Sequence, residues 1–259
     1  MRYLKLWWLM TKMVSQVALV SRFGAIIFMF GKILRFLFFL LFLLILISRT
    51  DAIAGYSAWQ IIFFFLTFNI VDTLAQFFLR EVYRFRSYVI SGDFDYFLTK
   101  PMPPLFRLLF GGSDILDLPI LFILVIFLGV ALTKIGGINI FGVILYTGLL
   151  INAFLIALAF HILVLSIGIL TTEVDNTLWL YRDVTSMGRV PIDIYREPLK
   201  WIITFIFPVG IMMSFPAKAV FGLLSLELIL ISVLVSATLF YLSVKLWNTS
   251  LKKYSSVSS

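Results

Sequence analysis

The sequence predicts an all-α integral membrane protein with six transmembrane helices. Of its 259 residues, 62% are hydrophobic and only 13% are charged, and its mean hydropathy is +1.08. A water-soluble core could not bury so much apolar surface, and 28 phenylalanines would promote aggregation in the cytosol. The formal charge of +8 comes from Lys and Arg between the apolar runs, which is typical of the cytoplasmic loops of membrane proteins. A nucleic-acid-binding protein would instead gather these charges on one folded polar surface, so we expect no nucleic-acid partner.

Residues 1–22 are predicted to form an amphipathic helix at the membrane surface. On a helical wheel, the polar residues fall within an arc of about 140°: Lys5, Thr11, Lys12, Ser15, Gln16 and Arg22. The helix should therefore lie in the interface of the lipid bilayer, with Trp7 and Trp8 at headgroup depth and Lys5 and Lys12 near anionic lipid. A signal peptide is the alternative, but no small-residue cleavage site precedes the next apolar run.

Six apolar runs follow within a transmembrane domain that we assign to residues 23–247. The predicted spans cover residues 23–48, 56–79, 115–133, 138–170, 201–215 and 223–246. The fourth is too long for one crossing of a hydrocarbon core of about 30 Å, so it should tilt or extend into solvent. The polar segments 80–112 and 171–198 are expected to be cytoplasmic, and residues 248–259 to be a flexible tail.

The basic residues predict the orientation. With both termini inside, all of the 21 Lys and Arg except Arg49, Lys134 and Lys218 lie on the inner side. Cytoplasmic loops carry such an excess, so this bias favours six spans over an odd number and a multi-pass protein of the cell membrane with both termini cytoplasmic. Lys32 and Arg35 lie near the start of the first span, where they must snorkel or face protein.

No catalytic, cofactor-binding or metal site is predicted. The string GAIIFMFGK at residues 24–32 lacks the spacing of a phosphate-binding loop and lies inside an apolar helix. The absence of Cys excludes thiolate metal sites and thiol nucleophiles, and other metal ligands are not clustered. His161 is the only histidine and has no acid near it in sequence, so a structural, hydrogen-bonded role is favoured over a catalytic one.

A polar face on the second span is the candidate translocation pathway. Its residues recur at i, i+3, i+7 and i+11, and therefore share one side of a helix: Asn69, Asp72, Gln76 and Arg80. Polar groups at membrane depth must face protein or water. Two interpretations remain open, namely hydrogen bonds that hold the helices together or a face that lines a cavity or subunit boundary. In a cavity, the carboxylate of Asp72 would favour cationic cargo.

The polar segment 80–112 contains the other candidate site. Asp93 is predicted to cap a short helix over residues 94–98, and the prolines that begin at Pro101 prevent its continuation. Three apolar side chains of this helix are expected to be exposed to the cytosol: Phe94, Phe97 and Leu98. A pocket in a partner protein or the membrane surface would have to cover them, and the spacing alone does not decide between these.

Two motifs resemble the membrane subunits of ABC-2 type exporters, in the six-helix group with the pattern G-x-[LF]-D-x-x-L-x-[KR]-P after helix two. The first is SGDFDYFLTKPMPPLFRLL, which matches at Gly92, Asp93, Phe94, Asp95, Leu98, Lys100 and Pro101. The second is RVPIDIYREPLKWIITFIFPVGIMMSFPAKAV, which matches at Pro191, Ile194, Tyr195, Pro208 and Pro216. Both occur in the expected order between the expected helices, and the resemblance extends over most of the chain.

The resemblance implies partners and a division of labour. In that family the segment after helix two is a coupling helix, seated in a cleft of a separate ATP-binding subunit, and Phe97 would join the matching residues in this contact. The N-terminal interfacial helix is the connecting elbow. Two permease subunits, identical or paralogous, would enclose a pathway, and ATP and Mg²⁺ would bind to the ATPase partners. The chain itself is therefore expected to bind no cofactor and to be no enzyme.

The expected function is export of an amphipathic or lipophilic substrate of the drug, lipid or glycan class, because the candidate pathway is rich in Phe and Leu. The alternative is a stand-alone secondary or ion-coupled carrier, which would need an inverted repeat and ionisable residues at the midplane. No convincing repeat is visible, and Asp72 and His161 are the only ionisable candidates at mid-helix. An enzyme that acts on lipid is a third class, but no constellation of catalytic residues is recognisable.

Overall fold

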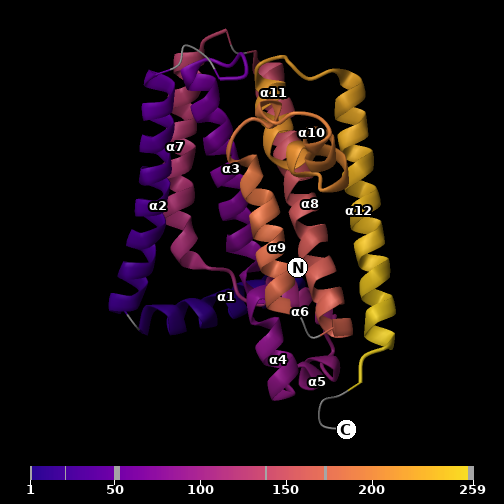
Figure 1. Ribbon diagram of the computed structural model, residues 1–259. Helices are drawn as coiled ribbons and strands as arrows, with labels where there is room; N and C mark the ends of the chain where they lie inside the picture. The colour runs from indigo at the N-terminus through magenta and orange to yellow at the C-terminus, as the bar shows by residue number, and fades with distance from the viewer. Residues whose placement is uncertain (1, 21, 50–52, 138, 172–173, 256–259) are drawn as a thin grey trace.

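A helical bundle accounts for the described part of the chain. The computed structural model describes residues 2–20, 22–49, 53–137, 139–171 and 174–255, and in these residues the only β-type pairing is an isolated bridge between Ile53 and Tyr56. The α-helices are α1 (Arg2–Val20), α2 (Arg22–Ser48), α3 (Ala58–Leu79), α4 (Phe85–Ser91), α5 (Asp93–Leu98), α6 (Pro104–Phe110), α7 (Leu118–Ile135), α8 (Ile140–Thr171), α9 (Val174–Ser186), α10 (Leu199–Trp201), α11 (Phe215–Val220) and α12 (Leu226–Lys252) (Figure 1). Short 3₁₀ turns are η1 (Arg80–Arg84), η2 (Ile115–Asp117), η3 (Met187–Arg189) and η4 (Ile192–Ile194), and π-helical turns are η5 (Ile202–Ile206) and η6 (Gly210–Ser214).

The central helix is α3, which begins at a capping box. The Ser57 hydroxyl accepts from the backbone N–H of Gln60 at 3.5 Å, and the Gln60 side chain accepts from the backbone N–H of Ser57 at 2.9 Å. Most of α3 is buried, whereas α2, α7 and α12 expose most of their apolar side chains. In a membrane protein these exposed apolar faces are suited to lipid. The chain therefore wraps α3 in helices that face the bilayer.

Among the residues that the structure describes, five helices are long and apolar enough to cross a membrane, and they confirm the predicted all-α membrane class. They are α2, α3 with its continuation, η2 with α7, α8 and α12. At 32 residues, α8 is about 48 Å long and must project beyond the hydrocarbon core, as expected. The last helix continues to Lys252, so the predicted tail at residues 248–259 is helical in its first part, and residues 256–259 lie outside the described residues.

The predicted fifth span at residues 201–215 is wrong as a single straight helix. The structure instead has two apolar pieces, Leu199–Ile206 and Gly210–Val220, which are bent by 81° at the break between them. Pro208 lies in this break and cannot donate a backbone hydrogen bond, and the turns on both sides are π-helical. This segment is a broken span or a re-entrant loop at the upper end of the bundle in Figure 1.

The segment 171–198, predicted as a loop confined to one end, runs along the bundle instead. Its first described residues are held near α4 by an ion pair of 2.8 Å between Arg86 and Asp175. At its other end, Asp193 accepts a hydrogen bond of 2.8 Å from the hydroxyl of Tyr56, just before the distant start of α3. In Figure 1, α9 accordingly rises beside α8, and it contacts η1, the continuation of α3. Residues 172–173 lie outside the described residues.

This additional passage changes where several basic residues lie. Arg182 and Arg189 are inside the bundle, and Arg196 and Lys200 lie with Asp193 at the Tyr56 end, so the prediction that these four residues are on the inner side is wrong. Both α1 and the end of α12 are nevertheless found at the same end of the bundle (Figure 1). We call this the α5 end, after the short helix that projects from it, and the other the Tyr56 end.

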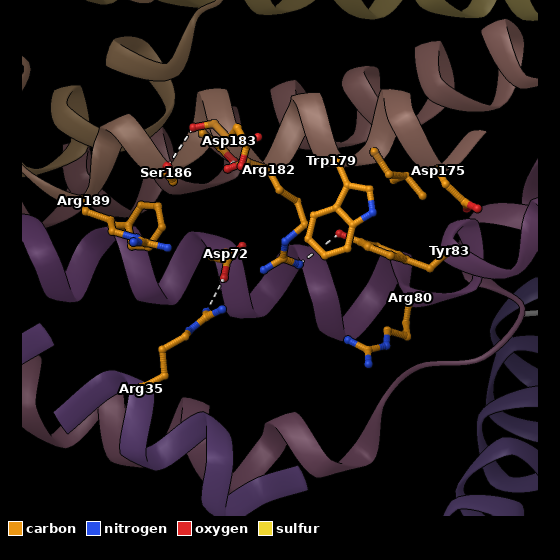
Figure 2. Close-up of a pocket in the computed structure, with 13 residues that line it drawn as sticks. Arg35, Asp72, Arg80, Tyr83, Asp175, Trp179, Arg182, Asp183, Ser186 and Arg189 are labelled. Atoms are coloured by element: carbon orange, nitrogen blue, oxygen red, sulfur yellow. Dashed lines mark hydrogen bonds and ion pairs between the residues drawn. The ribbon is translucent and has the colours of Figure 1, made fainter. Parts of the chain in front are cut away.

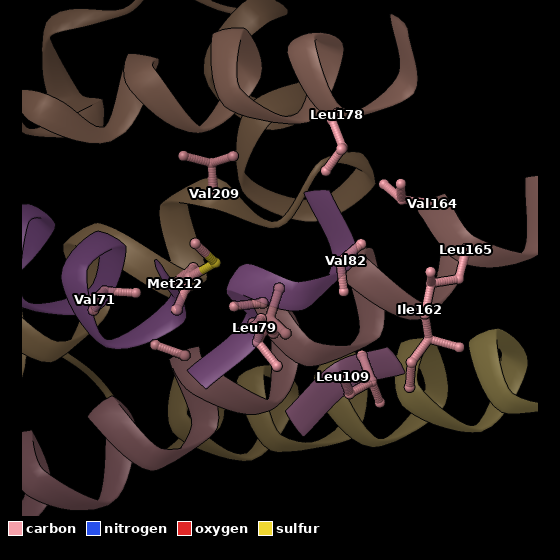
Figure 3. Packing of buried hydrophobic residues seen from close by; sticks show 14 of the residues in the cluster. Val71, Leu79, Val82, Leu109, Ile162, Val164, Leu165, Leu178, Val209 and Met212 are labelled. Carbon is pink, nitrogen blue, oxygen red and sulfur yellow. The ribbon is translucent and has the colours of Figure 1, made fainter. Parts of the chain in front are cut away.

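The apolar core packs α9 against η1, α8 and η6. Figure 3 shows Leu178 of α9 in the same cluster as Val82 of η1, Val164 of α8 and Met212 of η6. A Cβ atom added to Gly188 would approach Met213 Cγ to 2.5 Å, so only glycine allows η3 to pack this closely on η6. The position of α9 is therefore fixed by buried contacts along one face.

Chemical labelling tests the passage of α9. Because the chain has no Cys, single cysteines can replace the exposed Ser87, Lys134 and Arg196. An impermeant thiol reagent should reach positions 134 and 196 from the same side of the membrane and position 87 from the other. If the reagent labelled positions 196 and 87 from the same side, residues 171–198 would form a loop at one end of the bundle, and the fold described above would be wrong.

The cluster around Asp193 predicts a particular pH dependence. Burial alone would raise the pKa of Asp193, but hydrogen bonds from Lys200, Lys218 and Tyr56 outweigh it and lower this pKa to about 2. A carboxylate whose folded pKa is depressed stabilises above its unfolded pKa of about 4, and this contribution is lost as pH falls towards 2. Asp193→Asn should therefore lower the thermal midpoint of the purified protein by a constant amount from pH 8 to pH 5, and by less below about pH 4. Glu227→Gln, an exposed acid near the same end, serves as the control, and a difference that vanished already between pH 8 and pH 6 would refute the assignment.

Candidate functional site

A polar cavity of about 640 Å³ opens between α2, α3 with η1, and α9 (Figure 2). Its walls include four arginines, one on α2, one on η1 and two on the segment from α9 to η3. The lining residues are Arg35, Phe68, Asp72, Arg80, Tyr83, Asp175, Leu178, Trp179, Arg182, Asp183, Thr185, Ser186 and Arg189. An adjoining cavity of about 380 Å³ shares Arg35, Asp72, Arg80 and Arg182 with it and reaches Lys32 and Gln76.

The predicted polar face of α3 lines these cavities. Gln76 donates to the Asp72 carboxylate at 2.8 Å, and Arg80 donates to the Gln76 carbonyl oxygen at 3.2 Å. Asn69 donates to the backbone carbonyl of Phe65 at 2.7 Å and borders the second cavity. The common face is thus as expected, and these side chains both bond to one another and border open space. Their part in translocation remains a prediction.

Ion pairs across helices hold the charges that lie at membrane depth. Arg35 Nη2 on α2 lies 3.6 Å from Asp72 Oδ2 on α3, and Figure 2 shows the two side chains reaching across the cavity towards each other. Lys32, one turn earlier on α2, donates to the buried Asp117 of η2. Both basic residues of the first span therefore face protein carboxylates, which removes the cost of an unpaired charge in lipid.

The arginines of α9 and η3 were not predicted as site residues, because the segment was assigned to a loop. Arg182 donates to the Tyr83 hydroxyl at 3.3 Å. The Arg189 guanidinium lies 5.5 Å from the ring centroid of Phe39 and 5.6 Å from that of Phe68. Both side chains are half-buried. Their spacing of seven residues would place them on one face of a continuous helix, and this is the sequence signal that could have identified them.

His161 belongs to the packing and not to the cavity lining. It is 1% exposed, its Nδ1 lies 2.8 Å from the Ala157 carbonyl oxygen of the preceding helical turn, and its ring packs against Tyr181 at 4.9 Å between centroids. This geometry agrees with the structural role favoured from the sequence.

The segment after α3 forms a helical hairpin of α4 and α5 at the α5 end. Gly92 joins them with a φ of +80°, a left-handed conformation that favours glycine, and it is the N-cap of α5. The prediction that Asp93 caps this helix is therefore wrong, because its carboxylate instead accepts from the Ser91 hydroxyl at 2.7 Å. Lys100 lies over the Tyr96 ring at 3.5 Å.

Only part of the predicted apolar face of α5 is exposed. Phe94 is fully buried within the chain, with its ring centroid 5.2 Å from Phe85 and 4.9 Å from Tyr254, so its predicted exposure is wrong. Phe97 is half-buried, at 5.0 Å from Tyr88. The exposed side chains include Tyr96 and Leu98 on α5, Ile90 on α4, and Asp93, Lys100 and Pro101 beside them.

A buried carboxylate attaches the hairpin to the end of α3. Glu81 of η1 is 1% exposed and accepts from Arg107 at 2.6 Å, Tyr88 at 2.6 Å and Arg84 at 3.3 Å. Arg107 in turn lies 4.9 Å from the ring centroid of Phe97 on α5. These contacts connect η1, α4, α5 and α6 through a single charge, so the hairpin and α3 are held as one unit.

A helix, α1, forms where the interfacial helix was predicted, and it crosses the α5 end of the bundle in Figure 1. Its place at a membrane surface stays a prediction. Trp7 donates from its indole nitrogen to Ser113 at 2.9 Å, whereas Trp8 is exposed, as are Lys5 and Lys12. Trp7 is thus directed to protein, and the other three residues are free to meet a membrane surface.

Comparison with known proteins supplies one match. The model of a family described as ABC-2 family transporter protein matches residues 14–258, nearly the whole chain. No curated protein and no solved structure matches the sequence.

The Glu81 cluster predicts a strong stability effect. Glu81→Gln removes the charge that satisfies two arginines, and breaking a buried ion pair costs about 3 to 5 kcal/mol. The thermal midpoint of the purified protein should fall by about 6 °C or more. Arg107→Gln should cost a similar amount, and the double variant clearly less than the sum of both, since they share one interaction. Additive effects would show that Glu81 and Arg107 act independently.

Proposed function

The chain belongs to the ABC-2 family of transporter proteins, and from this premise we propose that it is the membrane-spanning permease subunit of an ATP-driven exporter. As a multi-pass membrane protein it supplies the pathway, and a separate ATP-binding subunit supplies the energy. ATP and Mg²⁺ are held by that subunit. A second permease subunit, identical or paralogous, completes the pathway.

The observation that carries this proposal is the mechanical continuity between the α4–α5 hairpin and the cavity. The hairpin projects at the α5 end, and η1 joins it to α3. The ion pair between Glu81 and Arg107 fixes this joint. Asp72 lies on α3, about two turns before Glu81. A push on the hairpin is therefore transmitted to the wall of the cavity.

In the proposed complex, the hairpin seats in a cleft of the ATP-binding subunit. Tyr96 is 59% exposed and Leu98 is 37% exposed, and these are the apolar side chains of α5 that a partner would cover. Phe94 and Phe97 pack inside the hairpin, against Phe85 and Tyr88, and stabilise it. The coupling surface therefore consists of Tyr96 and Leu98 with the surrounding Gly92, Asp93, Asp95, Lys100 and Pro101.

The proposal includes an orientation. The α5 end, which carries α1 and the end of α12, faces the cytoplasm, and α1 lies on the inner surface of the cell membrane with Trp8, Lys5 and Lys12 in the headgroup region. When the ATP-binding subunits close, α5 moves, α3 shifts against α2 and α9, and the cavity changes its access from one side to the other.

An amphipathic or lipophilic cargo fits the lining. A groove of about 340 Å³ beside the polar cavity is lined mainly by phenylalanines. Polar groups of a substrate would lie among the charged residues of α3 and α9, and its apolar part would lie in the groove.

Coupling is tested with exposed residues that do not support the hairpin itself. Tyr96→Ala combined with Leu98→Ala should weaken association with the ATP-binding subunit by about tenfold or more, because truncation of an interface anchor costs about 2 kcal/mol or more. Substrate-stimulated ATPase activity of the co-purified complex should fall in parallel. The matched control is Ile194→Ala, a similarly exposed apolar side chain at the Tyr56 end. Normal association and normal stimulation in the double variant would exclude α5 as the coupling helix.

A further inference from the structure

Two of the four cavity arginines have no acidic partner. Arg35 is paired with Asp72, and Arg80 Nε lies 3.8 Å from Asp114. Arg182 and Arg189, by contrast, form no ion pair with any acidic residue in the part of the chain that the structure describes. Of the acids in the same lining, Asp175 is held by Arg86 and Asp183 is exposed. The cavity therefore carries an excess of positive charge.

These two guanidinium groups line the same cavity at different heights. Arg189 of η3 contacts Phe68, near the middle of α3 and so at membrane depth, and Arg182 of α9 donates to Tyr83 of η1, nearer the α5 end. A charged side chain at this depth is costly unless it meets a counter-charge or water. Each guanidinium has up to five N–H donors, and Tyr83 is the one hydrogen-bond acceptor found for Arg182 among the described residues. The unused donors point to an anion with several acceptor oxygens.

An aromatic groove begins where the positive cavity ends. Its lining is Arg35, Phe36, Phe38, Phe39, Phe42, Phe65, Phe68, Asn69 and Arg189. Arg35, Phe68 and Arg189 belong to both spaces, so the groove and the polar cavity adjoin at these residues. A charged head and an apolar tail would each find a suitable surface within the length of one molecule.

We propose that this cavity binds an anionic amphiphile, with a phosphate-bearing head group on Arg182 and Arg189 and its apolar chain in the phenylalanine groove. Arginine forks suit phosphate because they form paired, charge-assisted hydrogen bonds with its oxygens. The proposal rests on the proposed function, since it names the cargo class of the exporter. It also reverses the expectation from the sequence, in which Asp72 alone would have favoured a cationic cargo, because Asp72 is neutralised by Arg35.

Binding is measured on the full-length chain in nanodiscs of zwitterionic lipid. The probes are a lysophospholipid with a phosphomonoester head and a brominated acyl chain, the same chain with a phosphocholine head, the same chain with a trimethylammonium head, and inorganic phosphate. Bromine quenches Trp fluorescence, and Trp179 borders the cavity, so Trp179→Phe identifies the part of the signal that comes from this site.

The phosphomonoester should bind at least tenfold more tightly than the phosphocholine or ammonium probe. Arg182→Gln combined with Arg189→Gln should abolish this preference, since each charge-assisted bond is worth about tenfold in affinity. The matched control is Arg196→Gln, an exposed arginine outside the cavity, which should keep it. Arg182→Lys combined with Arg189→Lys keeps the charge and should retain most of the preference, which guards against a mere failure to fold.

Three results would overturn the proposal. Equal affinity for the phosphomonoester and phosphocholine probes would remove the charge selectivity. Competition by inorganic phosphate at the same concentration as the amphiphile would make this a site for a free anion. Loss of the preference in Arg196→Gln would assign it to general surface charge.

The binding assay needs no ATP-binding subunit, so its outcome is separate from that of the proposed function. Arginine-dependent binding by a chain that never associates with an ATPase would refute the exporter alone. A chain that couples to an ATPase but shows no preference for the phosphomonoester would refute the anionic cargo alone.

Discussion

The structure depends on one electrostatic constraint: a charge that lies at membrane depth or is buried in the protein must meet an opposite charge or water. Arg35 meets Asp72, Lys32 meets Asp117, and Arg107 meets Glu81. In each case the partners come from different elements, so satisfying the charge also fixes how two elements pack. Exposed pairs contribute little to stability, but a buried partner such as Glu81, 1% exposed, makes its pair costly to break. The positions of α2, η2 and α6 around α3 follow from these contacts.

The same constraint explains which parts of the fold the sequence could predict. Long uninterrupted apolar runs identified α2, α3, α7, α8 and α12, because a helix that crosses the hydrocarbon core has to be apolar around most of its surface, whether it faces lipid or packs inside the bundle. The segment of α9 has an apolar face with Leu178 and a polar face with Arg182. When hydropathy is averaged along the sequence, the two faces cancel and neither is visible. Since its polar face borders a cavity, hydropathy alone assigns it to a loop. The bend at Pro208 was also hidden, because both pieces around it are apolar.

Of the candidate site, only the polar face of α3 was predicted, for a related reason. Asp72 and Gln76 interrupt an apolar helix and are therefore conspicuous in the sequence. Arg182 and Arg189 stand in a polar context, where an arginine carries no such signal. On α5, Phe94 was predicted to be exposed to the cytosol. It packs instead against Phe85 on the neighbouring α4 and against Tyr254, which is distant in sequence and is brought back to cover it only by the tertiary structure.

Assembly of two permease subunits would increase the positive charge of the pathway. If two such cavities faced each other across a two-fold axis, each copy would contribute Arg182 and Arg189 to a common space, and like charges would add. Their repulsion falls with dielectric constant and is largest when the space is dry, so an empty, closed pathway would be unfavourable. An anion between the copies would relieve this repulsion and favour closure around itself. A carrier with this charge distribution would therefore close more readily around its cargo than without it, which is the relation that couples substrate binding to a change of access.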